Sequence, residues 1–129
     1  MMAKSDPLVS VLMFVYNEAP YISRTLQSVL EQDYPNLEIL ISDNCSTDGT
    51  GDIISGMVRD DHRVALTRQV SNIGANANAL YVLNRAGGKY IIFVGGHDLL
   101  GGPQMISSLV AKMEADANIA LCVPKTVWV

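Results

Sequence analysis

Short apolar runs alternate with amphipathic stretches from the start of the chain to its end. Residues 9–15 (VSVLMFV) are apolar and β-branched, and the run is short enough for a strand that is buried on both faces. In the next stretch, residues 22–30, apolar positions recur at helical spacing until Tyr34-Pro35-Asn36 breaks the pattern. The same alternation of strand and helix recurs through the rest of the sequence.

The pattern predicts strands separated by helices throughout. The predicted strands cover residues 9–15, 37–42, 64–67, 90–94 and 119–123. The predicted helices cover about residues 20–32, 50–58, 76–85 and 103–115, and Asp48 or Thr50 is expected to cap the second. Apolar strands alternating with helices are typical of a parallel sheet between helical layers. The predicted fold class is therefore α/β, a Rossmann-like α/β/α sandwich with a mainly parallel sheet.

Length, charge and cysteine content narrow the class of protein. The chain has 129 residues, enough for one domain, and a net charge of -4 with no cluster of Lys or Arg. No nucleic-acid partner is expected, and an anionic ligand would need backbone amides or a metal ion. No apolar run approaches the ~20 residues of a transmembrane segment, and the polar start is unlike a signal peptide. Cys45 and Cys122 lack CxxC spacing, so we expect a reduced, cytoplasmic protein.

Unusual residues follow four of the predicted strands. In a doubly wound sheet, ligands bind outside the carboxyl ends of the strands, so these positions are expected to converge. A carboxylate or amide oxygen there can accept a hydrogen bond from a nucleobase N–H or a ribose hydroxyl. For the polar residues 46–50 we favour an ordinary turn that satisfies local backbone groups. The four segments are Tyr16-Asn17-Glu18, Asp43-Asn44, Asn72-Ile73-Gly74 and Gly95-Gly96-His97-Asp98.

Two common nucleotide-binding signatures are absent from the sequence. Gly49-Thr50-Gly51 resembles the start of a GxGxxG motif, but the sixth position is Ile54 and the loop follows the second strand rather than the first. No GKS or GKT of a P-loop occurs. Hydride transfer with a dinucleotide is therefore not the favoured function.

Four ordered segments resemble one enzyme family. The stretch VSVLMFVYNEAPYISRTLQSVLEQDYPNLEILISDNCSTDGT, followed by NIGANANAL and GGKYIIFVGGHDLL, resembles the inverting nucleotide-sugar glycosyltransferases of family 2, which have a GT-A fold. The likeness runs from about Leu8 to Cys122. It implies transfer of a sugar from a UDP-, GDP- or dTDP-linked donor, usually with Mn²⁺ or Mg²⁺. The implied acceptor is a saccharide, a lipid or another molecule, and the implied pathway is cell-surface polysaccharide biosynthesis.

The resemblance assigns nucleotide-binding roles residue by residue. It places Tyr16, Asp43 and Asn44 against the nucleoside, and Asn72 and Gly74 on the nucleotide side of the cleft. Asn44 departs from the commoner aspartate of the family, which leaves the preferred base open. Asn17 and Glu18 are expected to shape the first loop, with ligand contact as the alternative.

The GGHD segment occupies the place of the family's DxD motif, whose carboxylates hold the metal. Gly95 replaces the first aspartate and His97 the later one, so Asp98 is the carboxylate that remains. Gly95 and Gly96 would let the backbone approach the diphosphate. His97 and Asp98 are the predicted metal ligands. The alternatives for His97 are a side chain packed in a turn and a direct hydrogen bond to phosphate.

The resemblance also implies what lies outside these residues. No residue before Val129 matches the family's general base, so residues 1–129 are expected to form one donor-binding domain, truncated before the acceptor-binding half and inactive in transfer by itself. The full-length protein would work in the cytoplasm, at the inner face of the membrane. Apolar residues 127–129 predict a homodimer. The alternatives are a degenerate nucleotide-binding module, which the incomplete DxD motif favours, and a nucleotidyltransferase, for which YNEAP lacks the Gly-rich basic loop.

Overall fold

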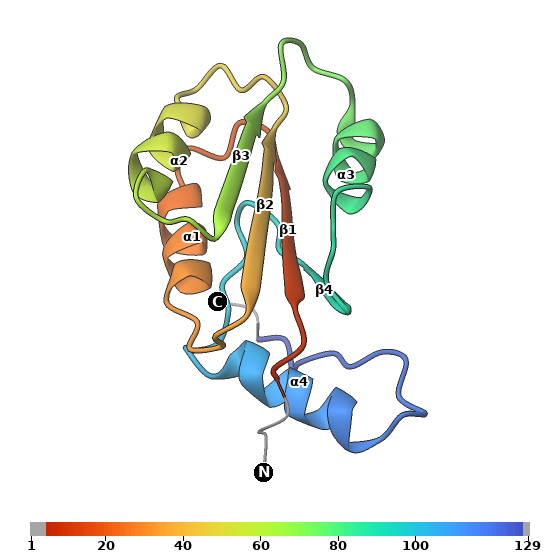
Figure 1. Ribbon diagram of the computed structural model, residues 1–129. Helices are drawn as coiled ribbons and strands as arrows, with labels where there is room; N and C mark the ends of the chain where they lie inside the picture. Colours follow the sequence, from red (N-terminus) through yellow and green to blue (C-terminus); the bar gives the residue numbers. More distant parts are fainter. Residues whose placement is uncertain (1–4, 128–129) are drawn as a thin grey trace.

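A computed structural model describes residues 5–127 and contains one parallel four-stranded sheet with the strand order β3-β2-β1-β4 (Figure 1). The elements, in chain order, are β1 (Val9–Val15), α1 (Ile22–Leu30), β2 (Leu37–Asp43), α2 (Thr50–Val58), β3 (Val64–Arg68), α3 (Ala75–Leu83), β4 (Tyr90–Phe93) and α4 (Met105–Ala115). The predicted α/β fold with a mainly parallel sheet is therefore confirmed.

β1 is one of the two inner strands and pairs on both sides from Val9 to Leu12. It runs in register with β2 from Val9 opposite Leu37 to Val15 opposite Asp43, and its first half also pairs with β4. Six of its seven residues are buried, which is why its sequence is apolar without alternation. This strand carries the first loop of the site to the carboxyl edge of the sheet.

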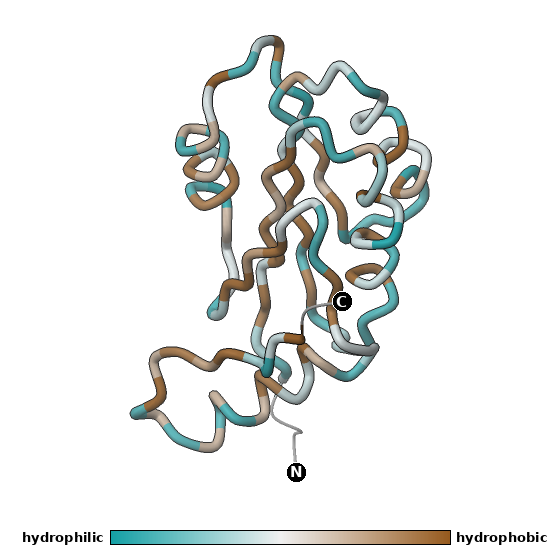
Figure 2. The backbone as a smooth tube through the Cα atoms, turned by 180° about the vertical axis from the view of Figure 1, so that it is seen from behind, coloured by the Kyte–Doolittle hydropathy of each residue, from teal (hydrophilic) through white to brown (hydrophobic). Residues whose placement is uncertain are grey.

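Helices cover both faces of the sheet. α1 and α2 lie against one face and contact each other, while α3 lies on the opposite face against β1 and β2 (Figure 1). α1 turns Ile22, Leu26 and Val29 into the core, as the helical spacing predicted. Seen from behind, hydrophobic segments follow the strands through the middle of the molecule (Figure 2). Because the strands are fixed from both faces, their carboxyl ends form a rigid support for loops.

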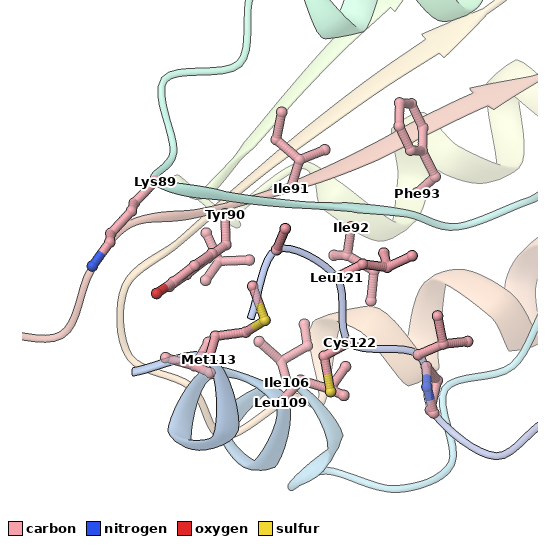
Figure 3. A pocket seen from close by; sticks show the side chains of 15 residues that line it. Lys89, Tyr90, Ile91, Ile92, Phe93, Ile106, Leu109, Met113, Leu121 and Cys122 are labelled. Carbon is pink, nitrogen blue, oxygen red and sulfur yellow. The ribbon is translucent and has the colours of Figure 1, made fainter. Parts of the chain in front are cut away.

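The predicted strand at residues 119–123 is wrong. The segment is not a strand, and Leu121 and Val123 are 78% and 69% exposed. It passes beside the unpaired edge of β4 without joining it, across an apolar groove of about 480 Å³ that β4 and α4 also line (Figure 3). A β-branched run becomes a strand only when a neighbouring strand takes up its backbone hydrogen bonds. The groove contains none of the predicted site residues.

The other predicted elements are present, and their ends differ by one to a few residues. α1 ends at Leu30, α3 at Leu83 and β4 at Phe93, each slightly earlier than predicted, and α4 begins at Met105. The cap of α2 also differs, because Gly49 occupies the N-cap position with a left-handed φ of 95°. Asp48 instead accepts a hydrogen bond from the Thr50 backbone N–H at 3.0 Å.

Candidate functional site

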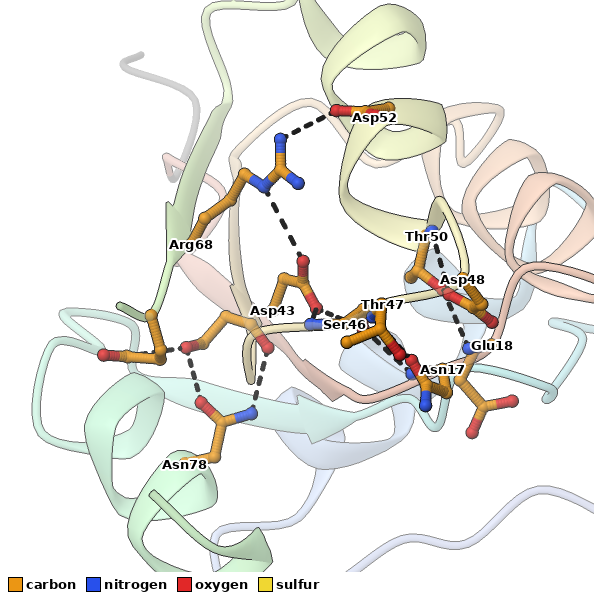
Figure 4. A network of polar contacts seen from close by, with 12 residues as sticks. Asn17, Glu18, Asp43, Ser46, Thr47, Asp48, Thr50, Asp52, Arg68 and Asn78 are labelled. Carbon is orange, nitrogen blue, oxygen red and sulfur yellow. Dashed lines mark hydrogen bonds and ion pairs between the residues drawn. The ribbon is translucent and has the colours of Figure 1, made fainter. Parts of the chain in front are cut away.

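The loops after β1 and β2 are joined by reciprocal hydrogen bonds at the carboxyl edge of the sheet (Figure 4). The Asn17 backbone N–H donates to Ser46 Oγ at 2.9 Å, and the Thr47 N–H donates to Asn17 Oδ1 at 2.9 Å. Asn17 has a φ of 51°, a left-handed conformation that asparagine tolerates better than most residues. Asn17 therefore shapes the first loop, as the sequence favoured, and contact between its side chain and a ligand stays a prediction.

Asp48 and Thr50 fix the backbone of the first loop. Thr50 Oγ1 accepts from the Glu18 N–H at 2.8 Å, and Asp48 Oδ2 accepts from the Ala19 N–H at 3.0 Å. The hydrogen bond from the Thr50 hydroxyl to Asp48, helped by the backbone N–H groups of Ala19 and Thr50, lowers the pKa of Asp48. The polar loop 46–50 is thus built from side chains that satisfy backbone donors, in line with the turn that the sequence favoured.

Asp43 is completely buried at the end of β2. Its Oδ1 accepts from both the backbone N–H, at 3.2 Å, and the hydroxyl of Ser46. Its Oδ2 has no hydrogen-bond donor within the described part of the chain; Arg68 Nε lies 3.7 Å away. Arg68 stands opposite Asp43 in the β2–β3 register and also donates to Asp52 at 2.8 Å. Contact between Asp43 and a nucleoside stays a prediction, and it would require this arginine to move.

Gly51 closes the space above Asp43. A Cβ atom at this position would lie 2.5 Å from both Arg68 Nε and Asp43 Oδ2. The start of α2 therefore packs directly on the carboxylate and its arginine. The GTG segment that resembled a dinucleotide motif has this packing role in the structure.

Asn44 joins the second and third loops. Its side chain is 3% exposed; Oδ1 accepts from the Ile73 N–H at 2.8 Å and Nδ2 donates to Asn72 Oδ1 at 3.0 Å. Asn72 Oδ1 also accepts from the Gly74 N–H at 2.9 Å, and Gly74 has a φ of 88°, which favours glycine. The structure thus brings together Asn44, Asn72 and Gly74, three of the predicted nucleotide-side residues. Their binding of a nucleotide remains a prediction.

A second buried amide was missed by the sequence reasoning. Asn78, in α3, is 1% exposed and forms two hydrogen bonds with Ser42, from Ser42 Oγ to Oδ1 at 2.6 Å and from Nδ2 to the Ser42 carbonyl at 3.0 Å. Gln69 adds a hydrogen bond to Ser42 Oγ at 3.0 Å. This cluster fixes α3 beside the end of β2, next to Asp43. The signal in the sequence was an asparagine between alanines at a helix position that faces the sheet.

The GGHD loop lies beside the first loop. His97 Nδ1 is 3.3 Å from Glu18 Oε1, and the Tyr21 ring meets the imidazole edge-on with centroids 6.4 Å apart. The Gly96 carbonyl accepts from Thr25 Oγ1 at 3.1 Å, so α1 also holds this loop. The His97 side chain is 65% exposed, which contradicts the alternative of a histidine packed in a turn.

Asp98 folds back onto its own loop. Its Oδ2 accepts from the Gly95 N–H at 2.8 Å, and its backbone N–H donates to the Gly95 carbonyl at 3.1 Å. A Cβ atom at position 95 would lie 2.8 Å from Asp98 Oδ2, so an aspartate at position 95 would require Asp98 to turn away. The absence of a carboxylate at position 95, where the DxD pattern has its first aspartate, therefore leaves the space in which Asp98 folds back onto the loop.

The side chains of the GGHD loop could supply only some of the ligands that a divalent ion needs. Within residues 5–127, no three His, Cys, Asp or Glu side chains are grouped closely enough to hold a metal by themselves. Mg²⁺ commonly binds through one or two carboxylates together with substrate phosphates and water, and Asp98 could supply one such carboxylate. Mn²⁺ accepts the same oxygen ligands and tolerates imidazole.

Tyr16 completes the rim of the site. It follows β1 directly and its side chain is 45% exposed, so the ring is open to a flat ligand.

Cys45 and Cys122 are both free thiols. Among the described residues, no helix combines the length and the apolar character that a bilayer crossing needs.

Comparisons with known proteins agree with this geometry. Residues 10–127 match the family described as glycosyl transferase family 2. The chain is 40% identical over 113 residues to the putative teichuronic acid biosynthesis glycosyltransferase TuaG of Bacillus subtilis, covering 88% of this chain and 45% of that protein. It is 31% identical over 108 residues to the GalNAc(5)-diNAcBac-PP-undecaprenol β-1,3-glucosyltransferase of Campylobacter jejuni, covering 82% of this chain and 34% of that protein.

A solved structure shares the fold. The mannosyltransferase PcManGT from Pyrobaculum calidifontis, solved in complex with GDP-Man and Mn²⁺, superimposes with a TM-score of 0.79 and 27% identity, covering 89% of this chain and 34% of that one. The GT-A-type fold that the resemblance implied is thereby confirmed. The chain spans less than half the length of these relatives.

Proposed function

Because the chain belongs to glycosyl transferase family 2, we propose that it is the donor-binding part of an inverting glycosyltransferase that uses a nucleotide diphosphate sugar. The observation that carries the proposal is the meeting of separate loops at the carboxyl edge of the parallel sheet, where Asn44 bonds Asn72 and Glu18 contacts His97. Ligands of open α/β sheets bind at this edge.

The proposed donor binds with its base at one end of the site and its diphosphate at the other. Tyr16 offers an exposed ring for stacking on the base, beside the loop that Asn44, Asn72 and Gly74 build. At the other end, Gly95 and Gly96 allow the backbone to approach the diphosphate. The base of the donor is uracil, guanine or thymine. PcManGT, bound to GDP-Man, gives the guanine nucleotide a precedent in a relative at 27% identity.

His97 and Asp98 would hold a divalent cation at the diphosphate end. A cation there neutralises negative charge on the leaving nucleoside diphosphate. The chain has a net charge of -4 and no Lys or Arg in the GGHD loop, so neutralisation is needed. PcManGT, with Mn²⁺ beside GDP-Man, supports manganese as the ion to try first.

The acceptor side of the reaction is proposed to lie outside residues 1–129. The general base that deprotonates the acceptor hydroxyl would come from that part of the protein. The match to a teichuronic acid glycosyltransferase supports a saccharide-type acceptor in cell-surface polysaccharide biosynthesis. We place the reaction in the cytoplasm, in agreement with the two free thiols.

Isothermal titration calorimetry tests the proposal. UDP, GDP and dTDP are titrated into the chain with Mn²⁺ and with EDTA, and we expect at least one to bind. Asn72→Ala, which removes the oxygen shared by Asn44 and Gly74, should weaken binding. Asn36→Ala is the matched control, because Asn36 precedes β2 at the opposite edge of the sheet and, within residues 5–127, its side chain bonds only the Asp6 carbonyl. Failure of all three nucleotides to bind would contradict the proposal; binding that is insensitive to Asn72 would place the ligand elsewhere.

A further inference from the structure

Glu18 and His97 meet although 79 positions separate them in the chain. Glu18 belongs to the loop after β1, and His97 belongs to the loop after β4. Glu18 Oε1 lies 3.3 Å from His97 Nδ1, and the Glu18 side chain is 21% exposed whereas that of His97 is 65% exposed. The carboxylate thus sits partly enclosed behind an imidazole that faces solvent.

The position of Glu18 is fixed from three directions. Its N–H donates to Thr50 Oγ1, and its carbonyl accepts from the N–H groups of Tyr21 and Ile22, each at 2.9 Å. Its side chain then passes over Gly96, where a Cβ atom would come within 2.5 Å of Glu18 Cγ. A side chain at position 96 would therefore displace Glu18 from the place where its carboxylate contacts His97. Figure 4 shows the Glu18 side chain directed away from the hydrogen bond between its backbone N–H and Thr50.

We propose that Glu18 is a positioning residue for His97, whose Nδ1–H donates to the Glu18 carboxylate so that Nε2 presents its lone pair to the ligand. A neutral imidazole carries one proton, and a carboxylate beside Nδ1 keeps that proton on Nδ1. The second nitrogen is then an acceptor or metal ligand with a fixed direction. This inference rests on the proposed function for the identity of the ligand, which is the metal-bound diphosphate of a nucleotide sugar.

The contact with Glu18 also favours histidine over aspartate at position 97 of this chain. An aspartate at position 97 would bring a second carboxylate next to Glu18, and two like charges at that distance repel each other. Histidine turns the same contact into an attractive one. Glu18 and His97 are thus expected to depend on each other, and His97→Asp should be tolerated better together with Glu18→Gln than alone.

Nitrogen NMR of the imidazole rings tests the positioning role without any ligand. The spectra are recorded at a pH at which the nitrogen shifts themselves show that both rings are neutral. In the wild type, we expect His97 to carry its proton on Nδ1; in Glu18→Ala, the proton should shift toward Nε2. His62 is the other histidine of the chain and serves as an internal control that should not change. An unchanged His97 signal in Glu18→Ala, or a wild-type proton on Nε2, would overturn the inference.

Calorimetry tests the consequence for the ligand. Loss of an outer partner of a metal-binding histidine typically costs about 10–100-fold in metal affinity, so Glu18→Ala should reduce the Mn²⁺ enhancement of UDP, GDP or dTDP binding at least ~10-fold. Glu18→Gln keeps an oxygen acceptor for Nδ1–H and should retain most of the enhancement. Glu31→Ala is the matched control, because Glu31 is exposed at the end of α1 and, among the described residues, its side chain bonds only Gln27.

The two proposals fail in different ways. If the wild type binds a nucleotide with Mn²⁺ and Glu18→Ala binds it equally well, the positioning role is wrong while the proposed function stands. If no nucleotide binds to the wild type, the proposed function is wrong, and the NMR result still decides whether Glu18 sets the tautomer of His97.

Discussion

Two glycines in α2 allow one substitution to be compared in two environments. Gly51 is buried and a Cβ atom there would lie 2.5 Å from Arg68 Nε and from Asp43 Oδ2, whereas a Cβ atom at Gly56 would meet nothing within 4 Å. Replacing glycine by alanine inside a helix gains about 0.8–1 kcal/mol of intrinsic propensity at either position. The propensity gain is common to both variants, so their difference isolates the steric conflict above Asp43.

The cost at Gly51 follows from how little its neighbours can move. Arg68 can swing toward solvent, since half of its side chain is exposed, but it then leaves the buried Asp43 carboxylate. Asp43 is itself held by the backbone and hydroxyl of Ser46. Overpacking at such a site typically costs about 1–3 kcal/mol. We therefore expect Gly56→Ala to be stabilised by up to ~1 kcal/mol and Gly51→Ala to lie about 1–3 kcal/mol below it.

Urea denaturation followed by circular dichroism measures both free energies of unfolding under the same conditions. The comparison is valid if the two variants unfold with the same dependence on urea concentration, because a changed slope would indicate a changed native or unfolded state. If Gly51→Ala proved as stable as Gly56→Ala, the packing of α2 on Asp43 and Arg68 would be refuted. The Asp43 carboxylate would then lie open rather than covered.

Three further predictions concern pH, association and the metal. The hydrogen bond from Thr50 lowers the pKa of Asp48, so its stabilising effect should be present above the ordinary aspartate pKa and be lost as the pH falls through the lowered value; the stability difference between wild type and Asp48→Asn, measured by denaturation across acidic pH, should shrink accordingly. Ile91, 44% exposed on the edge strand β4, should promote association at high concentration; Ile91→Ser should reduce it in sedimentation velocity, whereas Val70→Ser, in an exposed loop, should not. Asp98→Ala should remove most of the Mn²⁺ enhancement of nucleotide binding in calorimetry, and an enhancement equal to that of the wild type would exclude Asp98 as a ligand.

The hydrophobic pattern was sufficient to predict the elements whose type follows from their burial in the core. The run at residues 9–15 and the helical spacing of α1 led directly to the correct strand and helix. The run at residues 119–123 has similar composition, yet it is not a strand because no neighbouring strand pairs with it. Pairing is a property of the assembled sheet, so a local pattern does not contain it.

In the candidate site, too, local sequence patterns predicted some features, whereas contacts between distant elements could not be predicted. Strand ends indicated Asn44, Asn72 and Gly74, and the structure brings these residues together. The complete burial of Asp43 was not predictable, since Gly51 and Arg68 cover it from two other elements. The contact between Glu18 and His97 was likewise hidden, because no periodic signal links two loops that are far apart in the sequence.

The charges at the carboxyl edge explain how an acidic chain can approach a diphosphate. Several carboxylates there already occupy the backbone donors that would otherwise bind an anion: Asp48 takes the N–H of Ala19, and Asp98 takes the N–H of Gly95. Asp98 is exposed in the GGHD loop, so its side chain is free to exchange its backbone partner for a cation. In turning to a cation, Asp98 would release the Gly95 N–H to a phosphate oxygen. Binding of a cation by Asp98 would thereby free the Gly95 N–H for the diphosphate. An aspartate at position 95, the first of the family's motif, would then not be needed.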